Sequence, residues 1–145
     1  MASNLEKPPL WFWIVAVLVT AWGAMGVFGF YADIAMSDAT RAQLSDYDRR
    51  LLASRPAWYP FAYGGAVWSG LFGGIALLLR SAHAPSLLVL SAVLVVIMFG
   101  YIFAATDLIR VKGFFAAAGF PIVIFVIALA QIWFAGVARK RRWIG

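Results

Sequence analysis

The side chains that could do acid–base or metal chemistry in this chain are few and scattered. It has one histidine, His83, and no cysteine, which excludes thiolate chemistry, disulfides and clusters that bind zinc, haem or iron–sulfur centres. Most of the acidic residues lie in two polar segments that also carry arginine: Asp33, Asp38, Asp46, Asp48 and Asp107. Solvated aspartates mixed with arginines do not make an acid–base pair, and no nucleophile lies beside a base. We therefore expect a protein that is not an enzyme and uses no metal or other cofactor.

Neutral polar side chains within apolar sequence are the other candidates for chemistry. Four of them suit an uncharged substrate, because indole, amide and hydroxyl groups form hydrogen bonds without a charge: Gln131, Tyr101, Trp22 and Ser69. Such groups also join membrane helices by single hydrogen bonds, each worth about 0.6 kcal/mol. Gln131 is the most costly of the four to expose to lipid, because its amide has both donors and an acceptor to satisfy, so we expect this amide to face inward. The pattern favours hydrogen bonds between helices, with a polar cavity as the alternative.

Small residues recur at helical spacing. They form two adjacent stripes with a four-residue repeat and a looser, shorter series earlier in the chain: Gly65, Ser69 and Gly73; Ala66, Gly70 and Gly74; and Gly23 and Gly26. Small side chains let a second helix approach closely, which matters because lipid tails leave little hydrophobic drive between membrane helices. The spacing predicts close helix packing. Packing within the chain is favoured over contact between protomers or with another protein, and both stay open.

Four long apolar segments must position these residues. Hydrophobic residues make up 64% of the 145 residues and charged residues 12%, which is more apolar surface than a soluble fold of this length can cover. No segment carries a charge in its middle, and each approaches the ~20 residues that a helix needs to cross hydrocarbon. The sequence predicts an all-α membrane protein, a single-domain bundle of four transmembrane helices over approximately these residues: 10–31, 59–79, 86–106 and 115–138.

The connection over residues 32–58 is the only sizeable part outside the predicted spans. Ser45 precedes Asp48 by three residues, which is typical of a helix start, and Ser37 offers a second N-cap. Apolar residues after Ser45 fall on one face, and Pro56 ends the segment. We expect one or two short amphipathic helices lying on the membrane surface.

Three shorter features carry local expectations. The six-residue link 80–85 is too short for anything but an antiparallel hairpin between the second and third spans. Asp107 and Arg110 are spaced to pair across one turn. Pro121 is expected to mark the true start of the fourth helix, because the missing N–H costs least in a first turn.

The net charge of +6 follows the predicted membrane geometry, so we expect no nucleic acid partner. Each side of the membrane receives six of the twelve lysines and arginines, so the bare count does not orient the chain. The run at residues 139–142 adjoins a span end, where the positive-inside rule is strongest, whereas the opposing arginines are spread along a loop. Both termini are therefore predicted to be cytoplasmic, with the basic run close to anionic membrane lipids.

Several stretches have the look of a known family. They combine aromatic residues, prolines and a glycine-rich second span: residues 7–26 with Trp11, Trp13 and Trp22; Pro56-Ala57-Trp58; and Leu77-Leu78-Leu79-Arg80. Over nearly the whole chain the sequence resembles a family of small bacterial four-span proteins often labelled sugar transporters. Gly23 stands where that family commonly has Asn, so no substrate-binding amide is carried over to this position. The resemblance implies four helices in a bacterial inner membrane.

Two functions fit these observations. The first is an accessory or interaction protein, a helix bundle that docks on a larger membrane complex or on itself as a homo-oligomer. The alternative is a small oligomeric transporter or channel for a neutral solute such as a sugar, since four helices alone enclose little space. The lack of charge at depth and the small-residue stripes favour the accessory function.

Overall fold

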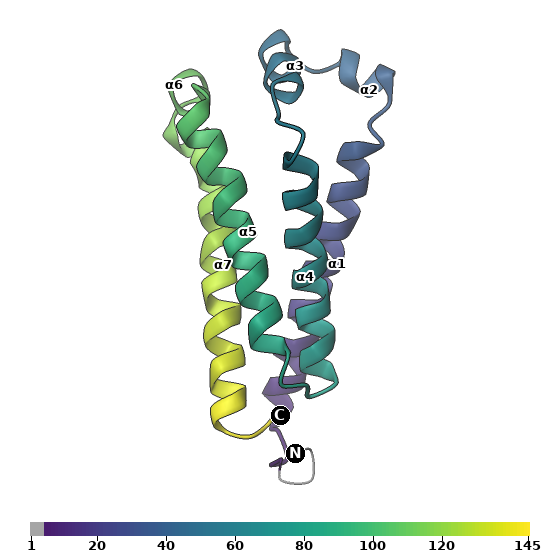
Figure 1. Cartoon of the computed structure of the whole chain (residues 1–145), viewed down its shortest axis with the longest axis vertical. Helices are drawn as coiled ribbons and strands as arrows, with labels where there is room; N and C mark the ends of the chain where they lie inside the picture. The colour runs from purple at the N-terminus through teal and green to yellow at the C-terminus, as the bar shows by residue number, and fades with distance from the viewer. Residues whose placement is uncertain (1–4) are drawn as a thin grey trace.

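The described part of the chain, residues 5–145, contains seven helices and no strand in the computed structural model (Figure 1). Four long helices run side by side and are long and apolar enough to cross a membrane: α1 (Leu10–Ile34), α4 (Tyr59–Leu78), α5 (Ala84–Ala105) and α7 (Phe114–Lys140). Three short helices lie together near one end: α2 (Asp38–Ala42), α3 (Asp46–Ala53) and α6 (Leu108–Lys112). The predicted all-α class with four spans is confirmed.

Two helix bounds differ from the sequence prediction in an informative way. α1 continues to Ile34, three residues past its predicted end. α7 begins at Phe114 and contains Pro121 in its interior, so the prediction that this proline starts the helix was wrong. A proline inside a membrane helix is tolerated because neighbouring helices and local adjustments satisfy the backbone groups that it leaves free.

The long helices pack in chain order, α1 against α4, α4 against α5, and α5 against α7. We call the end that holds α2, α3 and α6 the loop end, and the opposite end, which holds both chain termini and the α4–α5 turn, the terminal end (Figure 1). α1 and α7 meet at the terminal end, where the ring of Phe134 lies 5.8 Å from that of Trp11 and 5.7 Å from that of Phe12. One buried cluster is centred there, and a second one lies toward the loop end around Tyr59 and Met98.

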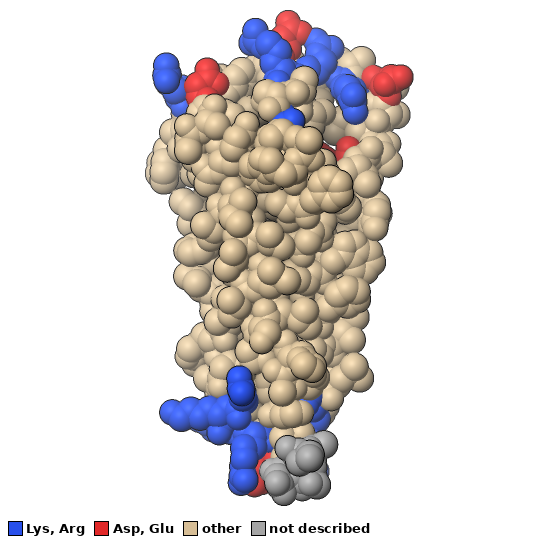
Figure 2. All heavy atoms as spheres, in the orientation of Figure 1, with Lys and Arg blue, Asp and Glu red and all other residues tan. Residues whose placement is uncertain are grey.

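Charged side chains gather at the two ends in the face that Figure 2 shows, and the surface between them carries none. This distribution is expected of a protein whose middle lies in hydrocarbon, since a charge at the bilayer centre is costly. Many large apolar side chains of the long helices are exposed, among them Phe28 at 77% and Phe115 at 88%. Burial inside the chain cannot explain these residues, whereas a lipid environment can.

The two short helices after α1 begin at the serines that the sequence indicated. The Ser37 side chain accepts a hydrogen bond from the Thr40 amide at 3.1 Å, and the Ser45 side chain accepts one from the Asp48 amide at 3.1 Å. Each cap satisfies a backbone N–H that a helix start leaves free. The predicted short helices and their caps are confirmed, although the second one ends at Ala53, before Pro56.

Polar contacts join α3 to the α6 region at the loop end. The Tyr47 hydroxyl donates a hydrogen bond to Asp107 at 2.8 Å, and the Lys112 ammonium lies 2.9 Å from the Asp48 carboxylate. Asp107 is thus bonded to Tyr47, and the expected pair with Arg110 does not form in the described chain. The hydrogen bond with Lys112 lowers the pKa of Asp48, and lost hydration together with Asp107 raises the pKa of Tyr47.

Candidate functional site

The contact between α1 and α4 is made by glycines that let two backbones meet. A Cβ atom added at Gly23 would lie 2.6 Å from the Cα atom of Leu71, and one added at Gly74 would lie 2.7 Å from the Cα atom of Thr20. Real Cβ atoms essentially never come so close, and the obstacle is backbone, so a larger residue at either position would force the two helices to shift apart. Gly26, one turn farther along α1, lies against the side chain of Val67.

The other small residues of α4 face α5. A Cβ atom at Gly73 would lie 2.6 Å from the Leu88 side chain, and Gly65 and Gly70 are covered in the same way by Leu94 and Ser91. The stripes therefore divide between two neighbours, because Gly74 faces α1 whereas Gly65, Gly70 and Gly73 face α5. All these contacts are made within the chain.

Two of the four polar candidates are bonded or packed away from any shared cavity. The Ser69 hydroxyl is buried and donates to the Gly65 carbonyl of its own helix at 2.6 Å. The ring of Tyr101 packs edge-on against Trp58, 5.2 Å away, near the loop end. Ser91, which was not among the four candidates, donates a hydrogen bond to the Ala66 carbonyl at 2.7 Å and so joins α5 to α4.

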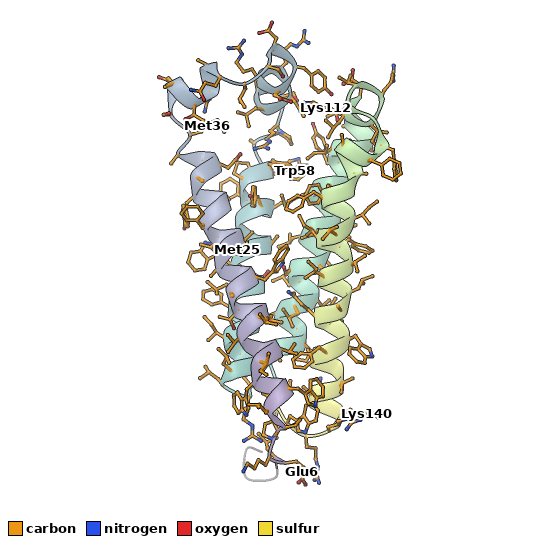
Figure 3. The ribbon with its side chains drawn as sticks, turned by 180° about the vertical axis from the view of Figure 1, so that it is seen from behind. Glu6, Met25, Met36, Trp58, Lys112 and Lys140 are labelled. Carbon is orange, nitrogen blue, oxygen red and sulfur yellow. The ribbon has the colours of Figure 1, made fainter. Side chains whose placement is uncertain are left out.

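The other two candidates, Trp22 and Gln131, lie in one groove between α1 and α7. The groove has a volume of about 410 Å³. Apart from Trp22 and Gln131 its lining is apolar and consists of Val15, Leu18, Val19, Ala21, Met25, Ile127, Ala130 and Phe134. Figure 3 looks onto the α1 and α7 side of the molecule, with Met25 labelled on α1. The rings of Trp11 and Phe134 are in contact, 5.8 Å apart, and Phe134 also lines the groove.

Gln131 is the chemically informative residue of this groove. It is nine residues from the end of α7 at Lys140, or about 14 Å along the helix axis, which places its amide well inside hydrocarbon. The side chain is half-buried, and within residues 5–145 no hydrogen bond joins it to another residue. An amide without a partner in hydrocarbon costs several kcal/mol, since lipid tails offer neither donor nor acceptor.

A second groove, between α5 and α7, has no such chemistry. It measures about 260 Å³ and is lined by apolar side chains alone, including Val93, Val96 and Ile132. Lipid acyl chains can cover this lining completely, because it has no polar group that needs a hydrogen-bond partner. The α1/α7 groove is therefore the candidate functional site.

Sequence reasoning did not find a charged pair near the loop end. The Arg55 guanidinium lies 2.9 Å from the Asp33 carboxylate and 4.6 Å from the centre of the Tyr59 ring, so it ties the end of α1 to the start of α4. Both charged side chains are partly buried. Their separation of 22 residues in the chain carries no local signal, which is why the pattern did not reveal them.

The terminal end holds a second arrangement that the sequence did not indicate. The Arg80 side chain donates to the carbonyl of Trp143 at 2.7 Å and to that of Glu6, and the Arg142 guanidinium pairs with the Glu6 carboxylate at 2.8 Å. Arg80 itself has a left-handed backbone (φ 55°) at the α4–α5 turn. These contacts bind the segment before α1 and the segment after α7 to one turn.

Comparison with known proteins adds no family to this geometry: no family model, curated protein or solved structure matches the chain. Nor does the part of the chain that the structure describes bring three His, Cys, Asp or Glu side chains together in a way that could hold a metal ion. The resemblance to small four-span proteins stays a prediction. Function must therefore be argued from the α1/α7 groove.

Proposed function

We propose that this protein is a non-enzymatic accessory subunit of a bacterial inner-membrane complex, and that it binds a transmembrane helix of its partner in the α1/α7 groove. The observation that carries the proposal is the Gln131 amide, which lies at depth in an open groove without a hydrogen-bond partner among residues 5–145. A helix that presents a polar side chain satisfies this amide, and a lipid tail does not.

The packing of the other helix faces supports the same choice. The glycine contacts of α4 are filled by α1 and α5, so they are not free for a partner. Half of the most apolar stretch of α4 is buried within the chain, against 11% of that of α7, which leaves α7 the most open of the four helices. Ala21 of α1 and Ala130 of α7 line the groove with small side chains, which permit close approach of a further helix.

The proposed orientation places the terminal end in the cytoplasm. In this orientation the basic run at residues 139–142 follows the positive-inside rule. Attachment of a cysteine-reactive, membrane-impermeant label to a single cysteine introduced at His83 or at Ser54 measures the orientation directly. Labelling of intact cells at Ser54→Cys but not at His83→Cys is the expected result, and the reverse result overturns it.

The test of the docking site is a matched pair of variants. Gln131→Leu removes the unpaired amide at nearly constant volume, and Ser69→Ala removes a polar group of similar depth whose hydrogen bond stays within α4. After gentle extraction from the native membrane, native mass spectrometry is expected to find the wild-type chain and Ser69→Ala in a stoichiometric complex, and Gln131→Leu largely free. Equal complex formation by both variants contradicts the proposal.

The partner in this complex is either a larger membrane protein or a second copy of the chain, and the measured mass separates the two. A homo-oligomer that depends on Gln131 assigns the groove to self-association. A complex of higher mass with a different polypeptide assigns it to an accessory role. A free wild-type monomer at natural abundance refutes both forms of docking.

Passage of a neutral solute is the second candidate function, and the presence of both Trp22 and Gln131 in the lining of one groove is the observation that favours it. An indole and an amide can bind hydroxyl groups without charge. Ser69 and Tyr101 lie elsewhere, so the four predicted residues do not line one polar path. Uptake of a neutral sugar into vesicles that contain only the purified chain, abolished by Gln131→Leu, would favour transport over docking.

A further inference from the structure

The two ends of the molecule carry equal numbers of cations and very different numbers of anions. Six of the twelve lysines and arginines lie at each end, whereas five of the six acidic residues lie at the loop end and only Glu6 at the terminal end. The formal charge is therefore 6 − 5 = +1 at the loop end and 6 − 1 = +5 at the terminal end, which together account for the net +6. Most of the excess positive charge is concentrated at one membrane surface.

Ion pairs at the loop end also occupy part of its cations. Asp46 pairs with Arg49, Asp33 with Arg55, and Asp48 with Lys112, so half of the cations there face a carboxylate in contact. Cations that already have a carboxylate partner gain less from an external phosphate. The loop end thus presents a nearly neutral surface on which half of the cations are paired.

At the terminal end fewer of the cations have a carboxylate partner than at the loop end. Glu6 is paired with Arg142, and Arg80 is bound to backbone carbonyls. No other carboxylate side chain lies at this end in the described chain, so four cations are left for an external anion: Lys7, Arg139, Lys140 and Arg141. All four are exposed.

Aromatic packing places part of this group at the level of lipid headgroups. The Arg141 guanidinium lies 5.6 Å from the centre of the Trp143 ring, and that ring packs edge-on against Trp11 at 5.1 Å. Trp11 is 45% exposed at the start of α1, where tryptophan is typical of the membrane interface. Arg139 and Lys140 occupy the last turn of α7, next to Arg141.

From this arrangement we propose that the terminal end is a binding surface for anionic phospholipid headgroups, with the exposed cations at residues 139–141 as its centre. The chemistry is that of guanidinium and ammonium groups with a phosphate, which arginine binds through paired N–H donors. Each basic residue near an anionic surface raises affinity about fivefold. Removal of all three is expected to lower the preference for anionic lipid on the order of 100-fold at low salt.

The test uses the purified chain in nanodiscs of mixed phosphatidylglycerol and phosphatidylcholine. Lipids that stay bound after release from the nanodisc are counted by native mass spectrometry. The terminal variant combines Arg139→Gln, Lys140→Gln and Arg141→Gln. The control variant at the loop end, with the same change of charge, combines Arg41→Gln, Arg50→Gln and Arg110→Gln.

Wild type and the control are expected to retain phosphatidylglycerol in preference to phosphatidylcholine, and the terminal variant is expected to lose that preference. Equal loss in both variants, or no preference in the wild type, overturns the proposal. A second measurement needs no variant: the preference of the wild type should weaken as salt rises from roughly 0.01 M to 1 M, because the screening length falls from about 30 Å to about 3 Å. A preference unaffected by salt also overturns it.

Discussion

The contact of Gly74 with α1 is the feature of this fold that a single methyl group tests most directly. In Gly74→Ala the new Cβ atom would lie 2.7 Å from the Cα atom of Thr20, whereas ordinary contacts begin at 3.4 Å. The helices must therefore separate locally, by 3.4 − 2.7 = 0.7 Å if an ordinary contact is to be restored. The obstacle is backbone, so no side-chain rotation relieves it, and overpacking of this kind costs about 1–3 kcal/mol.

A control is needed because alanine is the better helix former by about 0.8–1.0 kcal/mol. Gly136 in α7 supplies it, since a Cβ atom there meets nothing within 4 Å, and Gly136→Ala carries the same gain in propensity. The difference between the two variants isolates the steric cost. Gly73→Ala falls between them, because its Cβ atom meets the Leu88 side chain, which can move.

The assay is equilibrium unfolding in mixed detergent micelles, with helicity followed by circular dichroism. We expect Gly74→Ala to have a free energy of unfolding about 1–3 kcal/mol below that of Gly136→Ala. If the two variants are equally stable, α1 and α4 are not in backbone contact at this point. The account of the glycine stripes would then be refuted.

Three further results are expected from the same unfolding assay. The hydrogen bond with Lys112 lowers the pKa of Asp48 below the ordinary 3.8, so the Asp48–Lys112 pair stabilises the fold above this pH, and the stability is lost as pH falls through the lowered pKa. Lys112→Gln should abolish this acid-sensitive part of the stability, and an unchanged acid profile would contradict the prediction. Arg55→Gln should cost about 1 kcal/mol by leaving Asp33 partly buried without its partner, and a neutral effect would mean that the pair is fully solvated. Pro121→Ala should stabilise α7 by about 1 kcal/mol by restoring a backbone hydrogen bond, and a loss of stability would show that the proline is required where it stands.

Local features of the sequence were sufficient for the elements. Hydrocarbon leaves the helix as the structure in which one apolar segment satisfies its own backbone, so apolar length alone predicted the four long helices. The caps at Ser37 and Ser45 were equally legible, because a capping side chain bonds within three residues of its own position. The apolar segments predicted the ends of the helices less well. α1 continues to Ile34, past its predicted end, and Pro121 lies inside α7 and not at its start.

The candidate site depended on the tertiary structure. All four polar candidates were predicted to lie at depth: Trp22, Gln131, Ser69 and Tyr101. Only the packing of the helices separated the two that share a groove from the two that do not. The rotation of a helix about its axis is set by which of its surfaces pack against neighbours. For a helix in lipid, hydropathy alone does not distinguish the face that packs inward from the face that contacts lipid.

Partners distant in the chain were decided in the same way. Asp107 could be expected to pair with its neighbour Arg110, and the fold places Tyr47 against it instead, 60 residues away. The sequence by itself therefore determined the elements and the charge of each membrane surface, because these follow from local composition. Which helix each glycine touches, which polar group is left unpaired and which cations are left free were decided only by the tertiary structure, because each depends on side chains that meet across the bundle.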